Sequence, residues 1–147
     1  MDGAEREPFA SMRVRALCHA TEMRERVEQA VLNAVGEVQL DVSRTQGHHG
    51  NEIFVIEARS KGSRHAKLLF ERLNSSDKQE ILDTIDSRID ESCRLFIRLD
   101  KQKAFEEEVT LARDDDAIAI RIKVAAFPAR KPIAIRNVTE FVVSRVA

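Results

Sequence analysis

The segment Gly47-His48-His49-Gly50-Asn51 and the apolar run behind it, Ile53-Phe54-Val55-Ile56, constrain this chain's fold more than any other stretch. Glycine and asparagine adopt positive φ at little cost, so this composition predicts a tight connection. Apolar and polar residues alternate over 38–43, which predicts a half-buried strand before the loop. We therefore expect a hairpin with an unusually long connection, its two strands pairing antiparallel.

Hydrophobic periodicity divides the rest of the chain into further strands and helices. Alternation predicts strands beginning at Met12 and over about 94–99, 108–112 and 118–124. Apolar spacings of three and four predict helices over about 23–34, 66–73, 76–89 and 138–146. The expected order is β-α-β-β-α-α-β-β-β-α.

Residues typical of helix ends accompany the predicted helices. Thr21 is placed to cap the first helix, and Gly36 fits the end of that helix. Ser76 and Gln79 match a capping box, in which two side chains satisfy free backbone amides. Pro132 suits the first turn of the last helix.

We predict an α+β fold of two layers, with the helices on one face of a mostly antiparallel sheet. Each strand has one apolar and one charged face, so a single face needs cover. Residues 12–147 form one predicted α+β domain, and residues 1–11 form a disordered or frayed N-terminus. Cys18 and Cys93 are expected to be buried thiols. The polar start and the lack of a long apolar run predict a cytoplasmic protein without membrane association.

Charge is distributed unevenly along the chain. The formal net charge is −1, which does not suit a protein that binds any polyanion. Residues 71–116 carry eight basic and fourteen acidic side chains, whereas residues 117–147 carry six basic and one acidic. The chain has no Trp or Tyr, which counts against a surface built on aromatic stacking. A local basic patch and an ordinary solvated surface both remain open.

The two adjacent histidines permit three interpretations. His48 and His49 could bind a metal ion, but neighbouring residues of an extended loop point apart and the usual ligand spacings are missing. The glycine amides, the imidazoles and the Asn51 amide could instead contact a phosphate. In the third interpretation these residues only shape the turn. We expect no metal and no cofactor.

Basic residues form three further clusters: Lys101 with Lys103, Arg121 with Lys123, and Arg130 with Lys131. Together on one face, they would form a surface that follows a phosphate backbone. No nucleophile is placed beside a base, so we predict a protein that is not an enzyme.

Four segments in this order resemble a family. They are His19-Ala20-Thr21-Glu22, Gly47-His48-His49-Gly50-Asn51, Leu99-Asp100-Lys101-Gln102-Lys103-Ala104, and a closing helix near Pro132. The chain resembles, over about residues 12–146, an archaeal family described as RNA-binding proteins or predicted exosome subunits. The resemblance implies a fold like that of the large-subunit ribosomal protein called L-five. It also implies a homodimer in an archaeal cytoplasm, with structured or ribosomal RNA and exosome or ribosome-associated proteins as partners.

Our first hypothesis is therefore a non-catalytic accessory protein that binds the RNA backbone. The predicted RNA-binding residues are His48, His49, Asn51, Lys101, Lys103, Arg121, Lys123, Arg130 and Lys131. The alternative is a protein-interaction or assembly module that acts as a homodimer without binding RNA. A metal-dependent phosphoesterase that uses His48, His49 and nearby acids is the third hypothesis.

Overall fold

A five-stranded antiparallel sheet is the centre of the fold. The computed structural model describes residues 7–47 and 50–146. The strands are β1 (Phe9–Cys18), β2 (Asp41–Gln46), β3 (Glu52–Lys61), β4 (Arg94–Asp100) and β5 (Ala117–Val124), arranged in the order β2-β3-β1-β5-β4. The helices are α1 (Arg24–Val35), α2 (Arg64–Arg72), α3 (Ser75–Asp83), α4 (Ile85–Arg88), α5 (Lys101–Phe105) and α6 (Lys131–Val143). The α+β class and the antiparallel sheet are confirmed.

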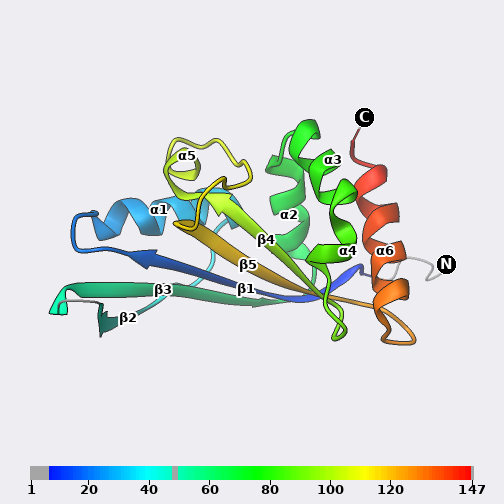
Figure 1. The fold of residues 1–147 in the computed structure, drawn as a ribbon, viewed down its shortest axis with the longest axis horizontal. Helices are drawn as coiled ribbons and strands as arrows, with labels where there is room; N and C mark the ends of the chain where they lie inside the picture. Colours follow the sequence, from blue (N-terminus) through cyan, green and yellow to red (C-terminus); the bar gives the residue numbers. More distant parts are fainter. Residues whose placement is uncertain (1–6, 48–49, 147) are drawn as a thin grey trace.

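The helices gather on one face of the sheet. In Figure 1 they lie above the strands, and none of the helices in the described residues covers the lower face. Val14 of β1, Ile97 of β4 and Ile120 of β5 are at most 2% exposed and pack under the helices. Their sequence neighbours therefore project from the uncovered face. We call this uncovered side the open face.

The first strand begins earlier than the sequence predicted. β1 starts at Phe9 rather than Met12, and the ring of Phe9 stacks on Phe70 in the core. The Phe9 amide donates to the Ser63 hydroxyl, and that hydroxyl donates to the Phe9 carbonyl. Residues 9–11 are thus part of the sheet, while residues 1–6 of the predicted frayed segment lie outside the described residues.

The hairpin is confirmed, but its first strand lies three residues later than predicted. β2 and β3 pair antiparallel, and Gly50 has the positive φ of 75° that glycine permits. All six residues of β2 are exposed, although a half-buried strand was predicted over 38–43. Val38 and Leu40 pack against the core before the strand begins. β2 itself lies at the edge of the sheet, where it pairs only with β3.

The predicted strand over 108–112 is not a strand. Only a single bridge joins Leu111 to Leu99, although Thr110 and Ala112 bond the backbone of β4. The buried Asp77 carboxylate accepts bonds from the Thr110 hydroxyl and the Leu111 amide. This side-chain anchor fixes the segment along the outer edge of β4 without a continuous ladder.

Helix boundaries also differ from the sequence prediction. α1 starts at Arg24, and Met23 rather than Thr21 occupies its cap position. The helix predicted over 76–89 is divided at Thr84 into α3 and α4. The side chain of Asn74, not Ser76, caps α3, because its oxygen accepts the Asp77 amide. The short helix α5 replaces the predicted connector after β4. The observed order is therefore β-α-β-β-α-α-α-β-α-β-α.

Both cysteines are buried and unpaired, as predicted. Cys18 is the last residue of β1, whereas Cys93 lies just before β4 with a positive φ of 62°.

None of the helices within residues 7–47 and 50–146 is long and apolar enough to span a bilayer.

Candidate nucleic-acid interface

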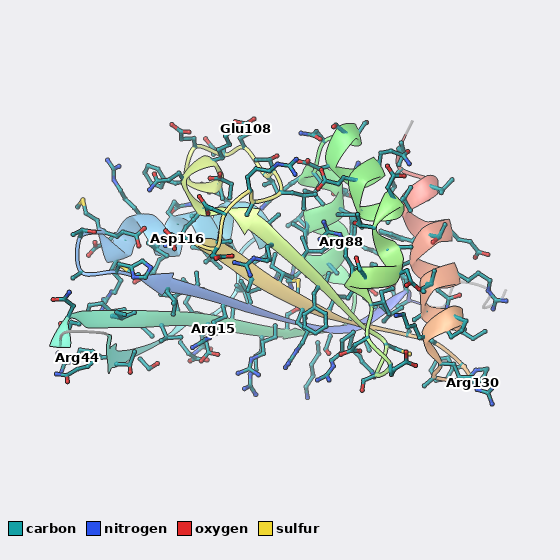
Figure 2. The ribbon with its side chains drawn as sticks, in the orientation of Figure 1. Arg15, Arg44, Arg88, Glu108, Asp116 and Arg130 are labelled. Carbon is teal, nitrogen blue, oxygen red and sulfur yellow. The ribbon has the colours of Figure 1, made fainter. Side chains whose placement is uncertain are left out.

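Cationic side chains line the open face. Residues directly opposite each other in an antiparallel sheet share a face, so the buried partners Val14 and Ile120 place their neighbours on the other side. The same reasoning applies to β3 and β4. Eight basic residues lie on the open face, and we call them the basic face: Arg13, Arg15, Arg59, Lys61, Arg94, Arg98, Arg121 and Lys123. Figure 2 shows Arg15 projecting away from the helices.

Strand register aligns these cations in rows across the sheet. Arg13 lies opposite Arg59 on β3 and opposite Arg121 on β5. In the neighbouring row, Lys123 of β5 lies opposite Arg94 of β4. These rows line a shallow concavity of about 660 Å³. Like charges directly opposite each other destabilise a sheet, and a bound polyanion would relieve that repulsion.

Carboxylates neutralise only part of the basic face. Arg13 pairs with Glu57 at 3.1 Å, and Arg94 pairs with Asp90 at 3.1 Å. The guanidinium of Arg98 reaches the loop carboxylate of Asp115 at 3.9 Å.

Within residues 7–47 and 50–146, the remaining cations of the basic face form no ion pair, although Glu57 of β3 lies opposite Arg15 in the strand register. The Lys123 ammonium donates to the Ser92 carbonyl rather than to an acid. Within the described residues, Arg15, Arg59, Lys61 and Arg121 have no ion pair. The centre of the open face therefore carries uncompensated positive charge.

The structure brings together only part of the predicted site. Arg121 and Lys123 lie in the basic face, as their shared alternation suggested. Arg130 is exposed in the loop between β5 and α6 (Figure 2). Lys131 opens α6, where its ammonium lies 3.8 Å from Asp86 and its side chain is 22% exposed.

The loop and the connector lie elsewhere. Asn51 is exposed at the tip of the β2–β3 hairpin, where its carbonyl accepts the Gly47 amide at 2.7 Å. His48 and His49 lie outside the described residues. Lys103 is exposed on α5, on the helical side of the sheet (Figure 1).

Lys101 is not a surface residue, and its prediction as part of an exposed basic surface is wrong. Its side chain is 3% exposed. The ammonium donates to the Leu17 carbonyl at 2.7 Å and to carboxylates of Glu22 and Asp116 at 2.9 and 2.8 Å. All three ammonium hydrogens are therefore used within the fold.

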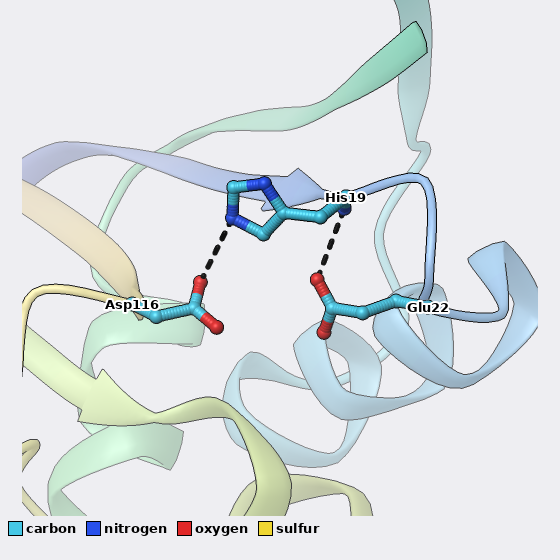
Figure 3. A group of neighbouring side chains, drawn as sticks. All are labelled: His19, Glu22 and Asp116. Carbon is cyan, nitrogen blue, oxygen red and sulfur yellow. Dashed lines mark hydrogen bonds and ion pairs between the residues drawn. The ribbon is translucent and has the colours of Figure 1, made fainter. Parts of the chain in front are cut away.

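The same region holds the cluster His19, Glu22 and Asp116, shown in Figure 3, which resembles a metal site. One ligand atom from each residue lies within 4.8 Å of the others. However, the Lys101 ammonium bonds both carboxylates and already supplies the positive charge that a metal would bring. The Glu22 carboxylate also accepts the His19 amide, so this junction is a structural cap. We assign the cluster to the fold and not to metal binding.

The pKa of Asp116 links this cluster to pH. Burial alone would raise that pKa, but the hydrogen bond and charge of Lys101, aided by His19, lower it below its ordinary value. A carboxyl whose pKa is lowered on folding stabilises the native state above its unfolded pKa, near 4, and loses this contribution as pH falls through the folded pKa. Asp116→Asn should therefore lose less stability than wild type between about pH 6 and about pH 3.

Urea unfolding at each pH measures this difference. The matched control is Asp86→Asn, because Asp86 is 89% exposed on the helical layer. Its curve should follow the wild type. Equal acid sensitivity of wild type and Asp116→Asn would contradict the role given to this carboxyl.

Of the basic face, only Arg121 and Lys123 were identified as site residues from the sequence. Alternation already placed Arg13 and Arg15 on one side of β1, and Arg94 and Arg98 on one side of β4. The missing information was the strand order, since β1 pairs with β3 and β5, which are distant in sequence. A search for basic residues at alternate positions in every predicted strand would have found the set.

An α+β fold with rows of cations on one open sheet face is typical of a protein that binds a polyanion. Comparison with known proteins points to the same class. A family model described as RNA binding matches residues 11–124, and the chain belongs to this family. RNA-binding protein PAB1135 of Pyrococcus abyssi is 34% identical over 141 residues, which cover 89% of this chain and 92% of that protein.

Solved structures show the same architecture. Protein AF2318 from Archaeglobus fulgidus is 33% identical, with a TM-score of 0.77 over 95% of this chain and 99% of that chain. Mth689, a DUF54 protein from Methanothermobacter thermautotrophicus, is 30% identical, with a TM-score of 0.81 over 92% and 99%. The relatives are archaeal, as the resemblance implied.

Proposed function

We propose that this protein is a non-catalytic RNA-binding protein whose basic face contacts the RNA backbone. The observation that carries the proposal is the row Arg59, Arg13 and Arg121, set side by side on three neighbouring strands. The family description and the name of the Pyrococcus relative support RNA as the ligand. Of the residues predicted from sequence to bind RNA, the proposal keeps Arg121 and Lys123. It also keeps Arg130 as a further contact in the loop after β5.

Guanidinium groups suit this task. Each offers a planar set of donors that bonds two phosphate oxygens at once. Arg59 and Arg121 have no ion pair in the described part of the chain, so binding a phosphate would break none there. The protein as a whole carries a net charge of −1, so attraction must come from this one face.

Binding that depends on phosphates must weaken with salt. Filter binding of the wild-type protein to RNA over a range of salt concentrations tests the proposed function. With four to six phosphate contacts, the logarithm of the affinity should fall with the logarithm of salt at a slope of about −3 to −5. Absent binding, or binding insensitive to salt, would contradict the proposal.

An assembly module remains the second candidate. β2 is an edge strand whose six residues are all exposed, and unpaired edges can pair with a second copy. The opposite edge, β4, is bonded by residues 110–112 at its end and by Asp90 at its start. For this second candidate we propose a homodimer formed through β2. Light scattering across protein concentrations should give twice the monomer mass, and a constant monomer mass would exclude the dimer.

Finer assignments rest on the family resemblance alone. They are the similarity to the ribosomal protein L-five fold, a cytoplasmic location, and a link to archaeal RNA processing by the exosome or to ribosomal RNA. We keep them as part of the proposed function. Copurification of RNA from archaeal cells, followed by sequencing of the bound species, distinguishes ribosomal RNA from other targets.

A further inference from the structure

Phe96 occupies an unusual position for an apolar residue. It is 42% exposed in β4, between the basic residues Arg94 and Arg98. Its register partner is Arg121 of β5, which itself lies opposite Arg13. The aromatic ring therefore ends the row of arginines that crosses the open face. Neighbouring strands lie about 4.8 Å apart, so the row from Arg59 to Phe96 is about 14 Å long.

The ring of Phe96 also differs from the other phenylalanines in its contacts. The rings of five phenylalanines contact another ring or a guanidinium within the described part of the chain: Phe9, Phe54, Phe70, Phe105 and Phe141. Among the described residues, no ring or guanidinium lies against the face of Phe96. Exposed aromatic area opposite Arg121, a cation with no ion pair in the described residues, matches the two needs of a nucleotide, an apolar base and an anionic phosphate.

We propose that Phe96 stacks on an unpaired base while Arg121 and Arg13 bind the adjacent phosphates. This inference rests on the proposed function and names its ligand more narrowly, as single-stranded RNA or an unpaired loop. A base inside a duplex is already covered on both faces by its neighbours, so it cannot stack on a protein ring. The lack of Trp and Tyr excludes an extended stacking platform, and a single ring leaves binding largely independent of sequence.

The absence of tryptophan allows a direct measurement. Phe96→Trp introduces the only indole of the chain at the proposed site. Single-stranded oligouridine should quench and shift its fluorescence in a saturable manner, whereas a fully paired duplex of equal length should change it little. The matched control is Met23→Trp, because Met23 is 62% exposed just before α1, away from the open face. Equal responses at the two positions would overturn the proposal.

Affinity gives the second measurement. Phe96→Leu keeps an apolar side chain but removes the π face, so affinity for oligouridine should fall about 5- to 10-fold. Affinity for the paired duplex should stay within about twofold of wild type. If wild type binds both RNAs with salt-dependent affinity and Phe96→Leu loses nothing on the single strand, stacking is wrong and the proposed function stands. If wild type binds neither RNA, both proposals fail.

Discussion

Replacing Arg59 and Arg121 together by glutamine is expected to lower the affinity for RNA about 30- to 100-fold at moderate salt. The two guanidiniums flank Arg13 in the central row and have no ion pair within the described residues. Each substitution removes one phosphate contact and one positive charge. The slope of log affinity against log salt should therefore become shallower by about 1.4 to 1.8.

The control must match the change in net charge. Lys103→Gln with Arg136→Gln also removes two exposed positive charges, from α5 and α6 and outside the basic face. This variant should keep the wild-type salt slope and lose less than about threefold in affinity. If both double variants lose affinity equally, net charge rather than the basic face governs binding.

Lys101→Met is expected to lower the free energy of unfolding by about 2 to 4 kcal/mol. The substitution keeps the length of the side chain but removes the ammonium. The Leu17 carbonyl then loses its lysine donor, and the Glu22 carboxylate, in a side chain only 17% exposed, loses its cationic partner. We place the effect below that of a fully buried pair, because Asp116 is 51% exposed and can turn to water.

Lys103→Met is the matched control, two residues along the same short helix. The side chain of Lys103 is exposed and has no ion pair among the described residues. Its substitution should change stability by less than about 0.5 kcal/mol. Urea unfolding measures both variants. Similar losses from Lys101→Met and Lys103→Met would contradict the structural role of the buried ammonium.

Local patterns predicted most of the fold. Alternation and helical spacing identified the strands that became β1, β3, β4 and β5, and they gave the helical cover on one face. They failed for the segment around Thr110, because a hydrogen bond that the Thr110 hydroxyl donates to the Asp77 carboxylate fixes it where a ladder was expected. β2 was misplaced because the strand is at an edge, where no burial imposes a pattern.

The candidate site was less predictable than the fold. Sequence could show that Arg121 and Lys123 share a face, because only the alternation of one strand is needed. It could not show that Arg13 and Arg59 lie beside them, because that depends on pairing between distant segments. Nor could the sequence show that Lys101 is buried and Lys103 exposed, because the acids that surround Lys101 are Glu22 and Asp116, which are distant in sequence.

A nuclear magnetic resonance titration with oligouridine, observed through the arginine Nε–Hε signals and the backbone amides, tests the central claim most directly. The account predicts that signals of Arg13, Arg59 and Arg121 shift together and saturate with one affinity, while those of Arg64 and Arg136 on the helices stay unchanged. Shifts that concentrate on the helical layer, while the signals of the open face stay unchanged, would contradict the account.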